Sequence, residues 1–350
     1  MKASYKKHIL DLKKPSGTSR GVLKQKESWF ITLQNDAQIG IGECGLLKGL
    51  SIDDVDTYEQ KLKWTCEHIH LGMDFLWQEL EEYPSIQFGI EQAFLSFEST
   101  DTFELFPSDF TSNENKIPIN GLVWMGDFEF MNDQIQQKLA EGFKCIKLKI
   151  GAIDFNQEIA LLESLRNQFS EPILEIRVDA NGAFVAEEAL EKLETLASFN
   201  LHSIEQPIKQ GQPTIMQQLC AKTPLPIALD EELIGISKLV EKEELLQTIQ
   251  PQYIILKPSL IGGFKGSQEW IDLADKYNIG WWVTSALESN IGLNAISQWT
   301  YTLDNKMPQG LGTGSLYTNN IESPLIVENG HIFYSQTKKW NMNQIENRCI

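Results

Sequence analysis

Six charged residues in this 350-residue chain have types and spacing that could do chemistry. Lys147 and Lys149 are one residue apart in the apolar run CIKLKI. Four more charges stand at the ends of later apolar runs: Asp179, Glu205, Asp230 and Lys257. Side chains alternate between the two faces of a strand, so the first two lysines are predicted to point the same way. The later charges could converge with them.

The intervals between these residues are even. Asp179 to Glu205 is 26 residues, Glu205 to Asp230 is 25, and Asp230 to Lys257 is 27. Each interval fits one strand, one helix and two short loops. The rhythm predicts successive units of a closed barrel, whose active site lies at the carboxyl-terminal face of its strands.

Three carboxylates at neighbouring strand ends repel one another unless a cation lies between them. Oxygen ligands that leave positions open for water and substrate favour Mg²⁺, with Mn²⁺ as a substitute. Alternatively, each acid is a solvated strand end or a helix cap, as Asp179 in DANG or Asp230 in LDEE could be. The neighbouring Glu231 and Glu232 are expected to be caps or surface charges.

Two ammonium groups beside a dication disfavour each other's protonation. At least one lysine is therefore expected to have a pKa below its usual value of ~10.4, toward the ~7 to 8 that suits a general base. The alternative is an exposed edge strand with outward-facing charges. A base beside a carboxylate-bound metal indicates removal of a proton α to a carboxylate.

Composition narrows the classes of partner. The net charge of -18 argues against nucleic acid and anionic membrane surfaces, which leaves a small-molecule substrate. No apolar run reaches membrane-spanning length and the first residues lack the apolar core of a signal peptide, so the cytoplasm is expected. Five scattered cysteines without a CxxC pair argue against a disulfide framework or a zinc site.

The chain divides near residue 115. Residues 2–12, 21–34 and 38–44 alternate like strands and predict a three-stranded meander. Residues 51–80 and 85–99 have helical apolar spacing, and Ser51 followed by Asp54 is an N-cap signal. We expect residues 1–115 to form an α+β domain.

Strands and helices alternate from residue 116 to about 320. Helices are predicted up to residue 141, over 155–169 and over 186–199, and eight strands are expected, the last closing weakly near residue 311. The tail, residues 321–350, is predicted to form a hairpin turning at Asn329 and Gly330. We expect it to pack near the barrel or back on the first domain.

The whole chain resembles the muconate-lactonising subgroup of the enolase superfamily. The features that carry the resemblance are KxK at Lys147 and Lys149, the acids Asp179, Glu205 and Asp230, and KP at Lys257. It implies the α/β class, a (β/α)7β TIM-like barrel with an N-terminal α+β capping domain, and a lysine base working with Mg²⁺ held by the three acids.

Within that subgroup the chain is most similar to the o-succinylbenzoate synthase family. Matching segments are RVDANGAF, ALDEEL, ILKPSLIGG and TSALESNIG, with SRG at residues 19–21. The similarity implies a hydro-lyase of menaquinone biosynthesis that dehydrates 2-succinyl-6-hydroxy-2,4-cyclohexadiene-1-carboxylate. Lys149 would take the α-proton and protonate the departing hydroxide, Lys147 would assist electrostatically, and Lys257 would stabilise the enediolate from the opposite side.

The same similarity implies contacts around the substrate. The residues concerned are Arg20, Gly262, Gly263, Ser285 and Ser289, with Asn181 beside the metal acids. Each also has a structural interpretation: loop and turn chemistry for the glycines and serines, a turn with Gly182 for Asn181, and a solvated loop charge for Arg20.

Other functions stay open. Dipeptide epimerases hold the ammonium group of their substrate with an acidic DxD on the last strand, where this chain has Leu311, Gly312 and Thr313. An N-acylamino acid racemase needs the same lysines on opposite faces and an apolar pocket. Mandelate-type members need a histidine on the seventh strand, which GWWVTSALES lacks. A non-catalytic binding barrel would be expected to lose one of the six charged residues.

Overall fold

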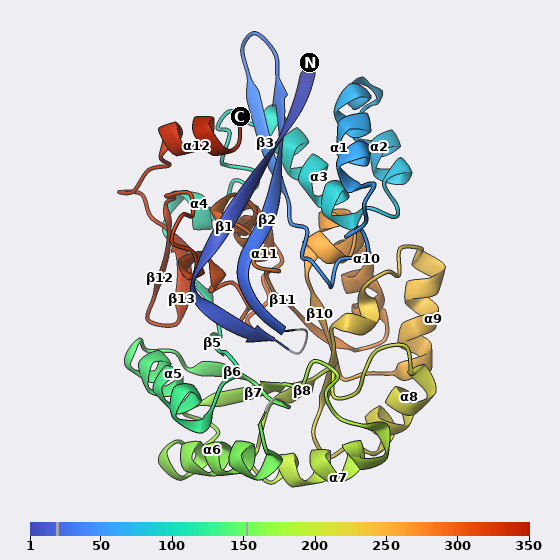
Figure 1. Cartoon of the computed structure of the whole chain (residues 1–350), viewed down its shortest axis with the longest axis vertical. Coiled ribbons are helices and arrows are strands. Elements are labelled where there is room, and N and C mark those ends of the chain that lie inside the picture. Colours follow the sequence, from blue (N-terminus) through green and yellow to red (C-terminus); the bar gives the residue numbers. More distant parts are fainter. Residues whose placement is uncertain (19–20, 152) are drawn as a thin grey trace.

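The chain forms an antiparallel sheet with attached helices, followed by strands and helices in alternation (Figure 1). The computed structural model describes residues 1–18, 21–151 and 153–350. This arrangement confirms the predicted class, a barrel of the (β/α) type with an N-terminal α+β cap. No helix in the described ranges is long and apolar enough to cross a membrane.

The cap is built on three antiparallel strands: β1 (Lys2–Thr18), β2 (Gly21–Gln34) and β3 (Ile39–Cys44). Because side chains alternate along β2, its two faces pack against different partners. Ile31 and Leu33 pack in a cluster with α3 residues such as Ile90. Phe30, on the other face, packs with Ile345 of the carboxyl-terminal tail. The second half of β2 is therefore buried on both sides.

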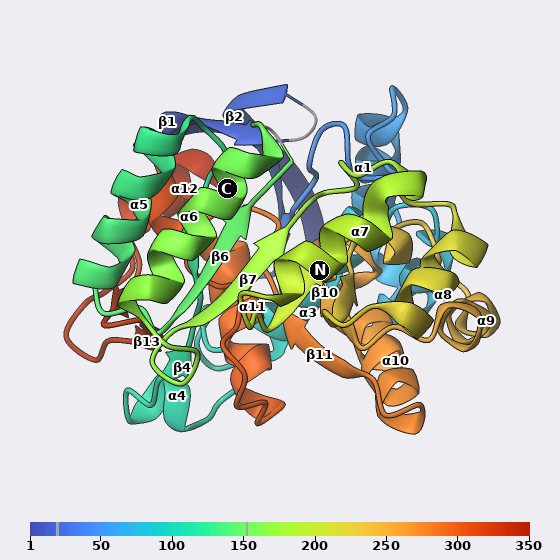
Figure 2. The same cartoon turned by 90° about the horizontal axis from the view of Figure 1, so that it is seen from below.

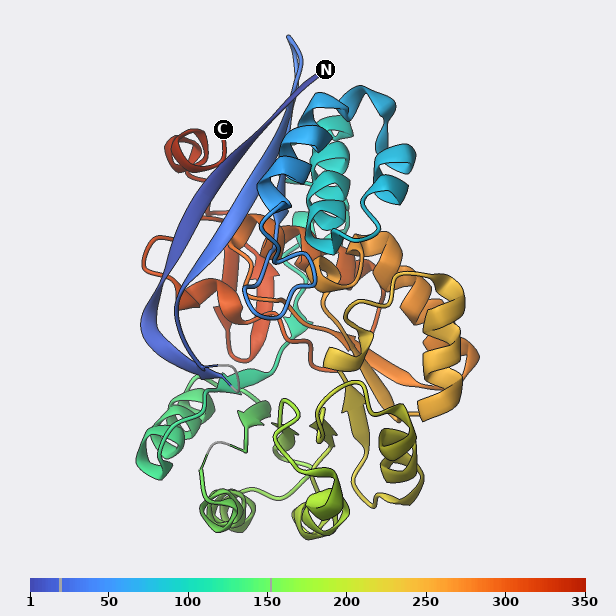
Figure 3. The same ribbon diagram turned by 45° about the vertical axis from the view of Figure 1, so that its right-hand side comes forward.

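The cap helices are α1 (Tyr58–Glu67), α2 (Met73–Glu79) and α3 (Pro84–Glu98), with a short turn η1 (Ile69–Leu71). Figure 3 shows them stacked beside the long β1–β2 ribbon. The predicted helix start at Ser51 is wrong. The Ser51 hydroxyl accepts from the amide of Leu47, and Asp54 accepts from the amide of Gly49, so both residues close a turn before the helix.

Seven parallel strands lie side by side in chain order, and helices cover their outer face (Figure 2). The strands are β5 (Gly121–Val123), β6 (Cys145–Lys149), β7 (Glu175–Asp179), β8 (Ser203–Glu205), β9 (Ile227–Leu229), β10 (Tyr253–Leu256) and β11 (Gly280–Val283). The helices are α5 (Phe128–Ala140), α6 (Phe155–Gln168), α7 (Ala186–Ala197), α8 (Pro213–Lys222), α9 (Leu239–Ile249), α10 (Gly263–Lys276) and α11 (Asn290–Thr302). Short turns η2 (Glu231–Leu233), η3 (Pro258–Leu260) and η4 (Thr313–Leu316) follow β9, β10 and the closing segment.

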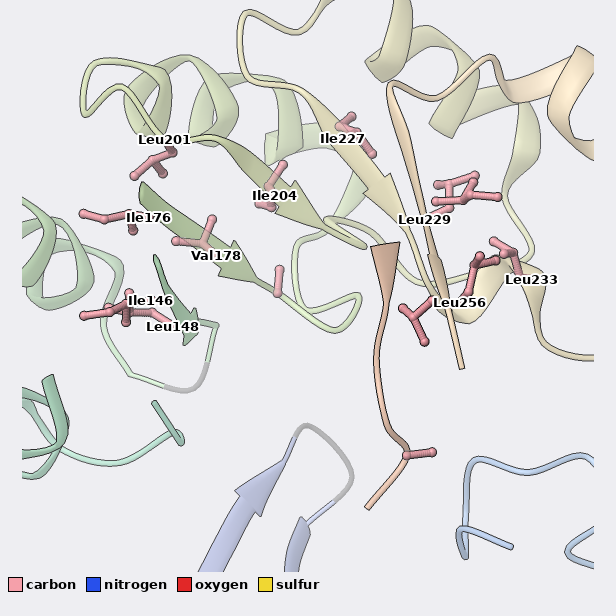
Figure 4. Packing of buried hydrophobic residues seen from close by; sticks show 14 of the residues in the cluster. Ile146, Leu148, Ile176, Val178, Leu201, Ile204, Ile227, Leu229, Leu233 and Leu256 are labelled. Carbon is pink, nitrogen blue, oxygen red and sulfur yellow. The ribbon is translucent and has the colours of Figure 1, made fainter. Parts of the chain in front are cut away.

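Alternate residues of these strands make the core between sheet and helices (Figure 4). Ile146, Leu148, Ile176, Val178 and Ile204 are essentially inaccessible to solvent. Burial of each such side chain contributes about 2 kcal/mol of transfer free energy. With these side chains committed to the outer layer, the residues between them must face the barrel axis.

The barrel closes without a regular eighth strand. In the described part of the chain, Gln309 and Gly310 make isolated parallel bridges to Ile119 and Thr284. The Gln309 side chain also accepts from the amide of Val283. The predicted eighth strand is thus reduced to a short bridging segment, because a side chain replaces part of the strand ladder.

The tail contains the predicted hairpin, β12 (Leu325–Glu328) and β13 (His331–Tyr334), with Asn329 and Gly330 at positive φ in its turn. β13 pairs with β4 (Ile117–Pro118), which follows the short helix α4 (Asp109–Ser112). The last helix, α12 (Met342–Arg348), lies against β1, and Thr32 donates to the carbonyl of Cys349. The tail therefore contacts both the barrel and the cap.

Candidate active site

The lysine pair on β6 faces the barrel axis. Ile146 and Leu148 pack outward in the core, so Lys147 and Lys149 lie on the opposite face, as their spacing predicts. Both side chains line the cavity at the carboxyl ends of the strands. The alternation of side chains along β6 therefore buries Ile146 and Leu148 on one face and presents Lys147 and Lys149 to the cavity on the other.

The three acids stand at the ends of the next three strands. Lys149 is in register with Asp179, and Asp179 is in register with Glu205. Asp230 directly follows β9. All three carboxylate residues are buried. Regular register along a parallel sheet therefore turns residues 26 and 25 positions apart into spatial neighbours.

Lys257 completes the group from the far side. It follows β10, which is separated from β6 by β7, β8 and β9 in the sheet. Its ammonium group contacts Asp230, while Lys147 contacts Glu205 and lies 2.9 Å from Asp179 Oδ2. Lys149 Nζ is 3.0 Å from the same Asp179 oxygen. The structure thus brings together all six charged residues that the sequence singled out.

The electrostatics of two lysines differ from the sequence prediction. Burial by itself would lower the pKa of Lys147, but the charges of Asp179 and Glu205 outweigh it and raise this pKa. The pKa of Lys257 is also raised, since the charge of Asp230 overcomes the effect of burial. The expectation that at least one of Lys147 and Lys149 has a lowered pKa is therefore not met at Lys147. At both lysines, Coulomb attraction to the neighbouring carboxylates outweighs the cost of desolvation.

The pKa values of Asp179 and Glu205 shift in opposite directions. Burial would raise the pKa of Asp179, but the charges of Lys147 and Lys149 lower it below its usual range. The pKa of Glu205 is raised, first by burial and then by the charge of Asp179. A buried acid beside two other acids is costly to ionise, and that cost falls when a cation approaches.

The donor set fits a hard divalent cation. Asp179, Glu205 and Asp230 offer only oxygen ligands, and Glu205 Oε1 is buried with no hydrogen-bond partner in the described structure. Among the described residues, no group of three or more His, Cys, Asp or Glu side chains is arranged to hold a metal ion, since each of the three acids is turned toward a lysine. Members of the enolase superfamily generally depend on a divalent metal.

Further polar residues orient the acids and Lys149. Asn181 Oδ1 accepts from Lys149 at 2.6 Å, its backbone amide donates to Asp179, and its side-chain amide donates to Glu231. Asn181 also has a positive φ of 44°, so the turn and the contact with the acids occur together. Gln206 Oε1 accepts from the amides of Asp230 and Glu232.

Glu231 and Glu232 are not surface charges, contrary to expectation. Both are buried, and Glu232 accepts from the amide of Gly211. The short turn η2 carries them inward, because it begins immediately after Asp230. A run of three acids in the sequence does not show which of them turn toward the interior.

The cavity beside the lysines has an apolar wall that the sequence did not reveal. Leu47 and Leu50 from the cap line it, together with Leu122, Trp124 and Leu316 from the barrel. Leu12 and Leu23 of the β1–β2 ribbon pack, like Leu47, Trp124 and Leu316, against a buried cluster of Leu10, Leu287 and Tyr317. These residues come from five segments with ordinary apolar patterns, so their sequence carried no signal of a shared site.

The predicted substrate contacts divide into three sets. Ser285 lines the cavity, and its hydroxyl lies 2.5 Å from that of Thr313. Gly262 and Gly263 do not line it: Gly262 lines a second cavity between the cap and α10, and the first turn of α10 is occupied by the Glu91 carboxylate. Arg20 lies outside the described residues.

Ser289 requires a correction. It is buried at the N-cap of α11, where its hydroxyl donates to Glu43 Oε2 at 2.5 Å and accepts from the amide of Ile291. Its hydroxyl is therefore used inside the protein and does not line the cavity. The sequence showed a polar residue near a strand end, but not which neighbour would take its hydrogen bonds.

Comparison with known families agrees with this geometry. Residues 131–338 match the family described as "Enolase C-terminal domain-like", and residues 11–97 match "MenC, N-terminal domain". The chain is 49% identical to the o-succinylbenzoate synthase of Desulfotalea psychrophila, with 94% of this chain and 98% of that protein covered. It is 26% identical to the o-succinylbenzoate synthase of Haemophilus influenzae, with 83% of each covered.

Solved structures show the same relationship. The crystal structure of MenC from Desulfotalea psychrophila superposes with a TM-score of 0.85 and 43% identity, covering 95% of this chain and 99% of that one. This agreement covers cap and barrel alike.

Proposed function

The chain belongs to the o-succinylbenzoate synthase family of the enolase superfamily, and from this membership we propose its reaction and the residues that perform it. The substrate is 2-succinyl-6-hydroxy-2,4-cyclohexadiene-1-carboxylate, which loses water to give o-succinylbenzoate in menaquinone biosynthesis. The observation that carries the proposal is the 49% identity along nearly the whole chain to a protein of that name. The enzyme is accordingly a hydro-lyase.

We assign proton transfer to Lys149. It lines the cavity, and its ammonium group is aligned by Asn181 Oδ1 and Asp179 Oδ2 at 2.6 and 3.0 Å. In its neutral form it removes the proton at carbon 1, α to the ring carboxylate. The resulting ammonium then gives a proton to the hydroxide that leaves carbon 6, so Lys149 ends neutral and one water is released. Aromatisation of the ring favours the forward direction.

Lys147 and Lys257 suit electrostatic roles. Both ammonium groups contact carboxylates at the ends of the strands, Lys147 that of Glu205 and Lys257 that of Asp230. Lys147 adds positive charge beside Asp179 and Glu205, near the carboxylate of the substrate. Lys257 lies across the barrel from Lys149 and stabilises the enediolate charge from the opposite face.

Asp179, Glu205 and Asp230 are the proposed ligands of Mg²⁺, which Mn²⁺ could replace. When bound, the cation supplies positive charge that stabilises the dianionic enediolate. The chain's own part is to present three buried carboxylates from adjacent strands. The amide of Asn181 donates to the Asp179 carboxylate, and Gln206 accepts from the backbone amide of Asp230. We propose Ser285 as a contact for a substrate carboxylate, and Arg20 stays a prediction.

The proposal also includes the domain division expected from the sequence, with a capping domain of residues 1–115 and a catalytic barrel of residues 116–320. The apolar residues Leu47 and Leu50 of the first part form cavity wall above the lysines of the second. A substrate bound between them would be shielded from water on one side and held by charge on the other.

The placement of Lys149 and Lys257 on opposite sides also suits a racemase, which removes a proton from one face and returns one to the other. N-acylamino acid racemisation is therefore the second candidate activity. The epimerase alternative lacks an acidic pair at Leu311, Gly312 and Thr313, and nothing in the described residues favours a non-catalytic barrel over the assembled charges.

The test is direct. Purified protein with Mg²⁺ and the cyclohexadiene substrate should generate the absorbance of the aromatic product, and chelation of the metal should stop it. Absence of turnover in metal-loaded protein would remove the dehydratase assignment. Polarimetry with N-succinyl amino acids under the same conditions tests the racemase reaction.

A further inference from the structure

Residues 284–289, which follow β11, form one wall of the cavity through Thr284, Ser285, Ala286 and Leu287. Leu287 has φ of 65°, in the left-handed region that a bulky side chain seldom adopts. Such a conformation persists only when the surrounding structure fixes it. The question is which groups hold this segment in place.

Two hydrogen-bonded groups hold the turn itself. The buried carboxylate of Glu288 accepts from the amide of Ala286 at 2.7 Å and from the hydroxyl of Ser259 at 2.5 Å. The hydroxyl of Tyr317 donates to the carbonyl of Leu287 at 2.6 Å. The carbonyl of the left-handed residue and the amide of the residue before it are therefore both bound.

A carboxylate from the cap fixes the end of the segment. Glu43, on β3, accepts from the amide of Ser289 at 2.9 Å, from its hydroxyl at 2.5 Å and from the amide of Gly292 at 2.9 Å. A fourth donor is the hydroxyl of Ser28 at 2.6 Å. Glu43 is fully buried at the first turn of α11, where a negative charge is stabilised by the free amides and the helix dipole.

The cap packs tightly against the residues that follow β11 and against Ser259. A Cβ on Gly292 would lie 2.9 Å from Glu43 Oε2 and from Glu288 Cβ. A Cβ on Gly45 of the cap would lie 2.8 Å from Ser259 Cβ. Both glycines are therefore needed for the close approach. Because Ser289 is bound to Glu43 through its amide and its hydroxyl, a displacement of the Glu43 carboxylate would move Ser289 and the residues before it.

We propose that Glu43 is a positioning residue, a cap-borne carboxylate that, with Glu288 and Tyr317, fixes residues 284–289 so that Ser285 and Leu287 stand at the cavity. It does not touch the substrate. Its effect on catalysis is exerted through the cavity wall, and the assignment rests on the proposed function for the identity of the substrate. The cap then contributes to substrate binding through a buried interdomain contact as well as through Leu47 and Leu50.

The chain contains a matched control. Glu91, also a buried cap carboxylate, accepts from the amides of Phe264 and Lys265 at the first turn of α10. The residues it binds do not line the cavity. Glu43 and Glu91 thus make the same kind of contact between cap and barrel helix, and only the first is connected to the cavity wall.

The experiment compares E43Q and E91Q in the full chain. Glutamine places an N–H₂ group against the amide of either Ser289 or Gly292, so one of these donors loses its acceptor. We expect E43Q to raise the KM for the cyclohexadiene substrate at least fivefold with kcat changed less than threefold, and E91Q to leave KM within twofold. Hydrogen–deuterium exchange of residues 284–293 should accelerate at least tenfold in E43Q and not in E91Q.

Two outcomes overturn the proposal. One is an unchanged KM in E43Q when both variants lower the melting temperature alike, and the other is exchange in residues 284–293 that matches the wild type. If E43Q does not fold, Y317F decides by the same two readouts, because it removes one hydrogen bond from the carbonyl of Leu287. Absence of wild-type turnover refutes the proposed function instead, and local exchange then still decides the role of Glu43.

Discussion

Replacement of Lys149 by alanine tests the assignment of the base most directly. The change removes an ammonium group that contacts Asp179 and Asn181 in the cavity. Asp179 retains Lys147 at 2.9 Å and the backbone amide of Asn181 at 2.9 Å, so its charge stays compensated. The variant should therefore fold, bind Mg²⁺ and bind substrate.

The expected loss of rate follows from two proton transfers by one residue. Positioned general acid–base groups typically contribute about 10²- to 10⁴-fold. Because Lys149 both removes the α-proton and protonates the leaving group, we expect kcat to fall by at least about 10³-fold, which corresponds to about 4 kcal/mol in activation free energy. The melting temperature should change by only a few degrees, since the side chain lies at a cavity and outside the apolar core.

The assay is the appearance of aromatic absorbance with saturating substrate and Mg²⁺, with calorimetric Mg²⁺ titration and thermal melting on the same samples. Lys144→Ala is the matched control, because Lys144 is an exposed lysine immediately before β6. A kcat of Lys149→Ala within tenfold of the wild type, with metal binding intact, would refute Lys149 as the base. The base would then lie elsewhere.

Three further outcomes test the metal, the core and a buried acid. Asp230→Asn should weaken Mg²⁺ binding at least about tenfold in calorimetric titration, because loss of a residue that only hydrogen-bonds to a metal ligand already costs this much affinity. An unchanged isotherm would contradict the ligand role of Asp230. Ile204→Ala should lower the free energy of unfolding in urea by about 2 to 4 kcal/mol, because the side chain is fully buried between β8 and the helices (Figure 4); a loss below about 1 kcal/mol would mean that the site collapses without a cavity. Burial raises the pKa of Asp53 from 3.8 to about 6. The folded protein therefore holds this proton more tightly than the unfolded chain, and the stability it contributes at low pH is lost as the pH rises between these values. Relative to Asp53→Asn, the wild type should lose roughly 3 kcal/mol between pH 3 and 7 in denaturant titrations; a difference that is flat or rises with pH would reverse the sign.

The sequence predicted those parts of the site that depend on local periodicity. Alternation on β6 orients Lys147 and Lys149 whatever surrounds the strand, and the even spacing of Asp179, Glu205 and Asp230 reflects repeated strand–helix units. Regular parallel register then leaves little freedom in where these residues meet. The barrel class and the meander of the cap follow from the same periodicities.

Other features depended on partners that are distant in the chain. Ser51 and Asp54 read as a helix cap, but both side chains accept hydrogen bonds from a preceding turn, and the helix starts at Tyr58. At least one of Lys147 and Lys149 was expected to have a lowered pKa because two ammonium groups are close together. Burial alone would lower the pKa of Lys147, but the charges of Asp179 and Glu205 raise it. Such outcomes are set by short distances that spacing does not encode.

What the sequence by itself determined is the set of groups on the barrel strands, because strand periodicity is a property of neighbouring residues. What only the tertiary structure decided is the environment of that set. The apolar wall from Leu47, Leu50 and Trp124, the inward turn of Glu231, and the binding of Ser289 by Glu43 all join segments far apart in the chain. Hydrogen bonds and packing act over a few ångströms, so their partners are fixed only once cap and barrel are assembled.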